Sequence, residues 1–255
     1  MMNQNVQSQY KTSDNLNTRI SIHAKYSTNK QPFGDWIMSH YEIEPGFRIL
    51  ELGCGTADAW KGRMSRLPHD AQLVLSDFSE GMLTSAKQNL GVHPQVEFRI
   101  IDIQSIPIND GTFDAVIANM MLYHVPDLHR GLSEVRRVLK PGGKFYCATY
   151  GEHGIMEFIN DSLRNLGIHG EIYKTFTLQN GRDILSEHFE DVQMFQRDDG
   201  LKINCVDDFV DYVMSLSSLT GIMDSRRDTL RRAFEEKLEN GMLYIPKEYG
   251  MFICK

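Results

Sequence analysis

The sequence predicts an α/β protein with a doubly wound, mostly parallel sheet, and three observations support this prediction. Apolar runs typical of buried strands alternate with amphipathic segments over residues 48–148, as in strand–helix–strand units with right-handed crossovers. The first apolar run, residues 49–52, enters a glycine turn that is expected to lead directly into a helix. At 255 residues and 41% hydrophobic content, the chain favours one domain with an inserted cap over two domains.

The glycine turn at residues 53–57, Gly-Cys-Gly-Thr-Ala, indicates a site for a nucleotide-like ligand. Gly53 and Gly55 permit positive φ angles and leave no Cβ between the main chain and a ligand. The expected helix would direct free N–H groups at that ligand. A dinucleotide fingerprint, Gly-x-Gly-x-x-Gly, would need glycine where the chain has Asp58, so hydride transfer is not favoured.

The second predicted strand, residues 73–76, ends at Asp77, which lies 24 residues after Gly53. A carboxylate at this place can accept hydrogen bonds from both hydroxyls of a ribose. The alternative is that Asp77 only caps the helix that follows.

The third and fourth predicted strands, residues 96–101 and 113–118, lead to Asp102 and Asn119. A Leu-Lys-Pro-Gly-Gly-Lys turn at 139–144 then leads into a fifth strand. Because the carboxyl ends of parallel strands meet at one edge of a sheet, beside its switch point, we expect these polar residues to lie together there.

In this order, the motifs resemble those of the class I S-adenosylmethionine-dependent methyltransferases, in particular small-molecule enzymes with a methyltransferase type 11-like domain. Glu-Leu-Gly-Cys-Gly-Thr at 51–56 resembles their motif I, and Ala57 stands at their usual third glycine, a position that accepts an alanine if its φ stays negative. The resemblance covers roughly residues 47–150. It implies a Rossmann-like, seven-stranded sheet whose last strand is antiparallel, with S-adenosylmethionine as cofactor and a small molecule as methyl acceptor.

The resemblance also implies which residues bind the cofactor. The glycine turn would hold the methionine end, and Glu51 would buttress that turn. Asp77 would bind the ribose, the Asp102 carboxylate would accept from the adenine amino group, and the Ile103 N–H would face the ring. The full set expected at the cofactor is Glu51, Gly53, Cys54, Gly55, Asp77, Phe78, Met82, Asp102, Ile103 and Asn119.

Two residues are candidates for the catalytic step, which mainly requires an acceptor held in line with the methyl group in a dry site. His124 follows the fourth strand, and its ordinary pKa of about 6.5 suits a base or an orienting group. The alternative is that its ring only shapes the loop through a backbone hydrogen bond. Tyr26 is the second candidate, because residues 22–41 resemble the N-terminal helical segment that covers the cofactor cleft in many small-molecule methyltransferases.

The remainder of the chain is predicted to complete the sheet and to add a helical roof. We expect an N-terminal tail and helical lid over residues 1–40 and a methyltransferase domain over 41–255. A helical insertion at about 200–241 would roof the active site, with protein–protein contact as its alternative use. The expected elements are helices at 155–166, 178–189, 206–216 and 230–238, a strand at 192–197, and a last, antiparallel strand at 249–254.

The composition of the chain limits the classes of partner that we expect it to bind. A net charge of -7 disfavours a nucleic-acid site. The four cysteines and nine histidines show no metal-ligand spacing, so no metal is expected. Without a secretory signal or a membrane-length apolar run, a cytoplasmic protein without a membrane partner is expected. The oligomeric state and the nucleophilic atom of the acceptor (O, N, S or C) stay open. The alternatives are an RNA or protein methyltransferase, or a non-catalytic binding module that keeps the fold.

Overall fold

The computed structural model describes residues 13–216, 219–220 and 226–255. The chain forms two compact units, each assembled from three separate stretches. The smaller unit contains the residues up to Lys30 together with Tyr150–Lys174 and Arg197–Tyr249. The sheet unit contains Gln31–Thr149, Thr175–Gln196 and Gly250–Lys255.

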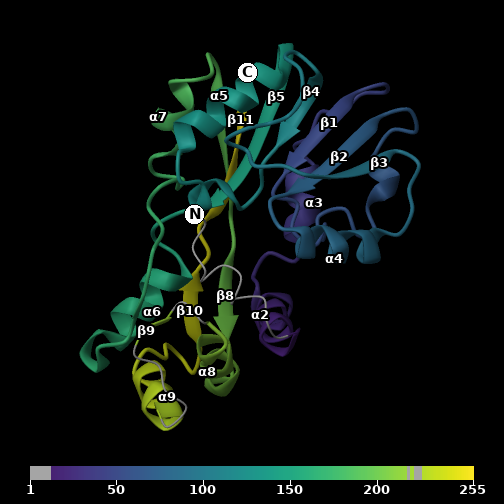
Figure 1. Cartoon of the computed structure of the whole chain (residues 1–255). Coiled ribbons are helices and arrows are strands. Elements are labelled where there is room, and N and C mark those ends of the chain that lie inside the picture. The colour runs from purple at the N-terminus through teal and green to yellow at the C-terminus, as the bar shows by residue number, and fades with distance from the viewer. Residues whose placement is uncertain (1–12, 217–218, 221–225) are drawn as a thin grey trace. The chain divides into compact units, whose positions relative to one another are not determined.

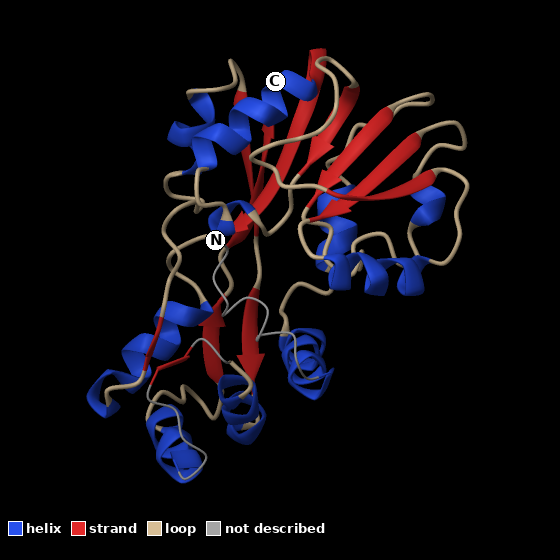
Figure 2. Ribbon diagram, in the orientation of Figure 1, coloured by secondary structure: helices blue, strands red, loops and turns tan. Residues whose placement is uncertain are grey.

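The sheet unit is built on a seven-stranded sheet, whose strands are among the arrows in Figures 1 and 2. Their bounds are β1 Arg48–Leu52, β2 Gln72–Asp77, β3 Val96–Ile100, β4 Phe113–Ile117, β5 Leu139–Tyr150, β7 Val192–Arg197 and β11 Tyr249–Cys254. The strand order is β3-β2-β1-β4-β5-β11-β7, and β1 to β5 pair in parallel. Asp191 and Lys255 exchange both of their backbone hydrogen bonds, which is the pattern of an antiparallel pair. The predicted sheet with its antiparallel last strand is therefore confirmed.

Both faces of the sheet are covered by helices, so its strands read as continuous apolar runs. On one face, Ile49 of β1 belongs to a cluster with α3 (Phe33–Met38) and α4 (Glu80–Leu90). On the other face, Leu50 belongs to a cluster with α5 (Leu128–Val138) and α7 (Gly181–Ser186).

The helix predicted directly after the glycine turn is absent, and that prediction is wrong. Between β1 and β2 the chain forms turns and one short 3-10 helix, Met64–Arg66. Gly62 interrupts the segment with a φ of +72°. Arg63 turns its guanidinium back to the Asp35 carboxylate, with Nε 2.8 Å from Oδ1. These contacts stabilise a compact loop in place of a regular helix.

Two other predicted helices are shorter than the sequence pattern suggests. The helical segment predicted to start at residue 22 is broken after Tyr26, because Ser27 leaves the helix and pairs with Leu201 in an isolated antiparallel bridge. The helix predicted at 178–189 is only α7, because the Asn180 side chain accepts a hydrogen bond from the Thr177 N–H and closes a turn there.

In its described residues, the smaller unit combines four helices with two short antiparallel ladders. Its core contains Ile22, Ile159, Phe209, Phe234 and Leu243. The strands β8 and β10, which the sequence does not indicate, pair in it, as do β6 and β9. The bounds are α2 Ser13–Tyr26, α6 Ile155–Leu163 with a 3-10 turn Arg164–Leu166, β6 His169–Gly170, β8 Gly200–Ile203, α8 Val206–Met214, β9 Leu219–Thr220, α9 Arg227–Glu235 and β10 Leu243–Pro246.

Candidate functional site

The candidate site lies where the strand order reverses. From β1 the chain continues to β2 and β3 on one side, whereas β4 and β5 lie on the other. In open α/β sheets a ligand binds in the crevice at the carboxyl ends of the strands beside such a switch point. At this switch point, the glycine turn follows β1 and Asn119 lies just after the neighbouring strand β4.

The glycine turn has left-handed backbone at both predicted glycines, with φ of +66° at Gly53 and +55° at Gly55. The Cys54 N–H donates to the Ser76 carbonyl at 2.8 Å, which anchors the turn to β2. A Cβ at Gly55 would meet no atom within 4 Å, so this glycine faces open space that a ligand can enter. Burial raises the pKa of the Cys54 thiol, so this thiol stays neutral.

Ala57 also has left-handed backbone, with a φ of +59°, so the condition of a negative φ is not met. The Ala57 N–H donates to the Cys54 carbonyl at 2.9 Å, and the Ala57 carbonyl accepts from the Trp60 N–H at 3.0 Å. These two bonds close consecutive turns and hold the alanine in this conformation, which an L-residue with a Cβ adopts at a cost of roughly 1–2 kcal/mol.

Glu51 is buried behind the turn, with 4% of its surface exposed. Its Oε2 accepts a hydrogen bond from the Trp60 indole N–H. Burial raises the pKa of Glu51 from 4.5 to about 7, although the hydrogen bond from Trp60 opposes this shift. The carboxyl group therefore changes charge near neutral pH, directly beneath the glycine turn.

Asp77 ties the end of β2 to the glycine turn. Its Oδ2 accepts from the Gly55 N–H at 2.9 Å, and its Oδ1 accepts from the Ser79 N–H at 2.8 Å. The N-cap of α4 is Ser79, whose hydroxyl accepts from the Met82 N–H, so capping by Asp77 is not the observed arrangement. Since each carboxylate oxygen has two lone pairs, both can still accept from a ligand hydroxyl.

The predicted adenine-side residues lie at the ends of β2 and β3. Asp102 accepts from the backbone N–H of Gln104 at 2.9 Å and from its side-chain amide. Ile103 is buried and packs near Gly131 of α5. Phe78 is 51% exposed, so its ring is available to stack on a planar ligand.

Asn119 has both ends of its amide engaged within the fold. Its Nδ2 donates to the Tyr41 hydroxyl at 2.6 Å, and its Oδ1 accepts from the Ala148 N–H at 3.2 Å. Met120 follows with a φ of +55°. The side chain of Met121 then lies against Gly53.

His124 ends the 3-10 helix Leu122–His124, and its ring lies 4.5 Å from that of Tyr123. Burial lowers the pKa of His124, so its imidazole is neutral at pH 7. A neutral imidazole can accept a proton from an acceptor group.

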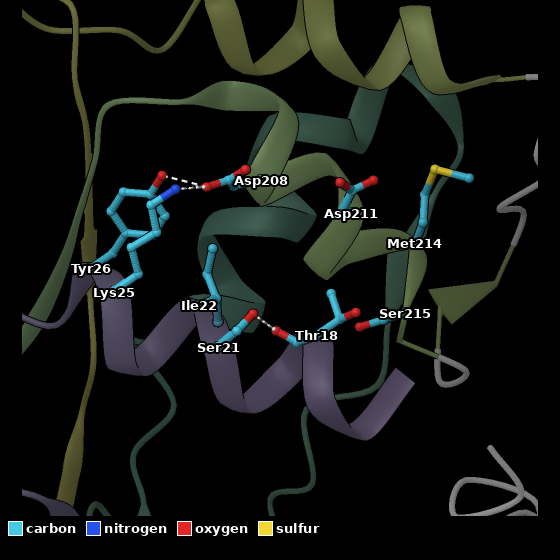
Figure 3. Close-up of a pocket in the computed structure, with 9 residues that line it drawn as sticks. All are labelled: Thr18, Ser21, Ile22, Lys25, Tyr26, Asp208, Asp211, Met214 and Ser215. Carbon is cyan, nitrogen blue, oxygen red and sulfur yellow. Dashed lines mark hydrogen bonds and ion pairs between the residues drawn. The ribbon is translucent and has the colours of Figure 1, made fainter. Parts of the chain in front are cut away.

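Tyr26, the other catalytic candidate, belongs to the smaller unit and lines a pocket between α2 and α8 (Figure 3). Its hydroxyl donates to Asp208 Oδ2 at 2.5 Å, and Lys25 Nζ binds the same oxygen at 2.6 Å. Burial raises the pKa of Tyr26, so it is not a base in this arrangement. The pocket has a volume of about 620 Å³ and is lined by Thr18, Ser21, Ile22, Lys25, Tyr26, Asp208, Asp211, Met214 and Ser215.

The sequence analysis did not identify the structural partners of the candidate site residues. Trp60, Ser79 and Met121 had no motif to single them out, and Tyr41 was only the last residue of the segment 22–41. In the part of the chain that the structure describes, no group of three or more His, Cys, Asp or Glu side chains is placed to hold a metal ion. Nor is any described helix long and apolar enough to cross a membrane.

The chain is similar to known methyltransferases. A family model described as a methyltransferase domain matches residues 50–147. Demethylmenaquinone methyltransferase of Symbiobacterium thermophilum is 32% identical over 123 residues, which are 45% of this chain and 49% of that protein. The chain spans about half the length of the curated relatives it matches.

Two solved structures share the fold at low sequence identity. One is a protein from an antibiotic biosynthesis pathway of Anabaena variabilis, with a TM-score of 0.62 and 15% identity, covering 87% of this chain and 96% of that one. The other is phosphoethanolamine N-methyltransferase 2 of Haemonchus contortus in complex with S-adenosyl-L-methionine, with a TM-score of 0.59 and 18% identity, covering 97% of this chain and 58% of that one. Residues 50–147 of this chain therefore match a methyltransferase domain, and the chain has the Rossmann-like fold of these two structures.

Proposed function

We propose that the chain transfers a methyl group from S-adenosylmethionine to a small-molecule acceptor. The observation that carries this proposal is the junction of Asp77 with the glycine turn. It sets a carboxylate with spare lone pairs beside an open main-chain surface at the sheet's switch point. This combination fits a ligand with vicinal hydroxyls joined to a group that must approach the backbone closely.

S-adenosylmethionine would supply an electrophilic methyl group on its sulfonium. Asp77 would orient the cofactor through its ribose, Asp102 and the Ile103 N–H would bind the adenine, and Phe78, Met82 and Cys54 would border it. The glycine turn, with Glu51 behind it, would hold the methionine end, near Asn119. These residues bind and orient, and this is most of what methyl transfer requires of a protein.

His124 is proposed to take the proton from an oxygen or nitrogen acceptor, because its imidazole is half-buried and neutral at pH 7. If it acts in this way, His124→Ala will reduce turnover while leaving the cofactor Kd unchanged. Tyr26 is proposed only as an orienting group, since its hydroxyl is engaged by Asp208.

A small molecule is the favoured acceptor class. The net charge of -7 opposes binding of RNA. The relatives named above act, by their names, on demethylmenaquinone, so a quinone-like ring is the first acceptor to assay. The four cysteines are free thiols, which is consistent with the proposed cytoplasmic location.

The test is calorimetric titration with S-adenosylmethionine and S-adenosylhomocysteine, repeated on Asp77→Asn. The wild-type protein is expected to bind both ligands. The variant should bind about thirtyfold more weakly, since a hydrogen bond to a charged group contributes about 2 kcal/mol. Ser79→Ala is the matched control: it removes the neighbouring N-cap but no group expected at the ribose, so its Kd should stay within about twofold of wild type. Absence of binding to either ligand would refute the enzyme proposal and favour a binding module.

A further inference from the structure

The side chain of Met121 connects the two segments that border the switch point, one after β1 and one after β4. Gly53 follows β1, and Met121 belongs to the segment that follows β4. A Cβ placed on Gly53 would lie 2.9 Å from Cγ and 3.0 Å from Cβ of Met121. The thioether side chain therefore rests directly on the Gly53 Cα, at the place where a ligand of an open α/β sheet enters.

The position of Met121 depends on an unfavourable backbone conformation one residue earlier. Met120 has a φ of +55°, which costs a residue with a side chain roughly 1–2 kcal/mol. Its N–H donates to the Ala148 carbonyl at 2.8 Å. A conformation of this cost persists only where the surrounding structure enforces it, so the anchor of the preceding residue is decisive.

That anchor is the Asn119 amide, which is held from two directions. Ala148 of β5 donates to its Oδ1, and this bond fixes which end of the amide is the donor. The Nδ2 end then donates to the Tyr41 hydroxyl at 2.6 Å. Tyr41 lies 78 residues earlier in the chain, between α3 and β1, and its ring packs edge-on against Tyr146 at 5.1 Å.

We propose that Tyr41 is a positioning residue for methyl transfer. Through its hydrogen bond to Asn119, it holds Met120 in the left-handed conformation and keeps the Met121 side chain on Gly53. It thereby sets the shape of the methionine end of the cofactor site. This inference rests on the proposed function, because it takes the glycine turn to be the cofactor turn.

The test compares Tyr41→Phe with Tyr146→Phe. Tyr41→Phe keeps the packed ring and removes only the hydroxyl. Tyr146→Phe is the matched control, because its hydroxyl accepts from the Glu42 N–H at 3.1 Å and its ring belongs to the same core cluster. Each protein is titrated with S-adenosylhomocysteine. Each is also labelled with ¹³C-methyl methionine for NMR, and the Met121 resonance is assigned with Met121→Leu.

Tyr41→Phe is expected to weaken S-adenosylhomocysteine binding about tenfold, the effect of one lost hydrogen bond, and to shift the Met121 methyl resonance. Tyr146→Phe should change neither. Wild-type affinity with an unmoved Met121 resonance in Tyr41→Phe would overturn the inference. If Tyr41→Phe does not fold, Asn119→Ala serves instead, because it removes the amide that donates to the Tyr41 hydroxyl, together with the acceptor for the Ala148 N–H.

The two proposals fail separately. If the wild-type protein binds neither cofactor form, the proposed function is refuted, while the Met121 resonance still reports whether Tyr41 positions that side chain. A shift in Tyr41→Phe then supports the positioning role, and an unchanged resonance excludes it.

Discussion

Ala57 is the residue at which the glycine turn departs most from what its side chain favours. It is 1% exposed and has a φ of +59°. Ala57→Gly should leave the free energy of unfolding within about 0.5 kcal/mol of wild type, because the release of left-handed strain offsets both the entropy that a glycine adds to the unfolded chain and the loss of a buried methyl group. Urea unfolding measures this change. Ala59→Gly is the control, since Ala59 is not among the positive-φ residues and should lose stability. Equal losses in both variants would show that the turn is not strained.

Glu51 gives the stability of the protein a pH dependence of predictable sign. Its pKa is about 7 in the folded protein and 4.5 by its ordinary value. The stabilisation that the protonated Glu51 gives the folded protein is fully present below pH 4.5. It is lost as the pH rises through 7, because between these values Glu51 ionises only in the unfolded chain. The loss amounts to about 3 kcal/mol.

Glu51→Gln should remove that loss, since glutamine does not ionise and still offers an oxygen to the Trp60 indole. Urea unfolding of both proteins between pH 4.5 and 7.5 measures the difference. The contribution of His23 to stability changes with pH in the opposite direction, because burial lowers its pKa to about 4. The comparison with the variant therefore isolates Glu51. Parallel pH profiles for the two proteins would contradict the raised pKa.

Among the secondary-structure elements, the strands were predictable and the loop after β1 was not. Strands buried on both faces must be apolar throughout, so residues 73–76 and 113–117 read directly as β2 and β4. The helix predicted after the glycine turn does not form, because Gly62 adopts a positive φ and Arg63 bonds the distant Asp35. Local periodicity does not record such contacts. The ladder of β8 and β10 was missed for the same reason, since it joins segments about 40 residues apart.

In the candidate site, too, sequence position identifies some residues, whereas the contacts that fix them cannot be predicted from it. Asp77 and Asp102 were placed by their position at strand ends, which sequence shows. What fixes the site lies far away in the chain: Tyr41 bonds Asn119 across 78 residues. The indole of Trp60 meets Glu51 only because the intervening loop folds back. These partners come from packing, and no spacing rule selects them.

At the scale of the whole molecule, the smaller unit draws on three stretches of chain, and a buried ion cluster joins two of them, the N-terminal stretch and Arg197–Tyr249. Asp199, Arg197 and Lys247 have side-chain exposures of 0%, 2% and 4%. Asp199 accepts from both cations and, at 3.1 Å, from the Asn29 N–H, while Lys247 also donates to Ser27 at 2.8 Å. The cluster thus fastens the end of the N-terminal stretch to the two segments that border β8 and β10.

Asp199→Asn should therefore destabilise the smaller unit selectively. It removes the carboxylate that pairs with the buried Arg197 and Lys247, and removing one partner of a buried ion pair costs about 3 kcal/mol. Asp208→Asn is the control in the same unit, because the Asp208 pair with Lys25 is exposed and contributes less than about 1 kcal/mol. Hydrogen exchange should become faster in α8, β8 and β10 of Asp199→Asn and stay at the wild-type rate in β1, β2 and β4. Uniform acceleration across both units would show that the two open together, and the ion cluster would then support the whole chain rather than one unit.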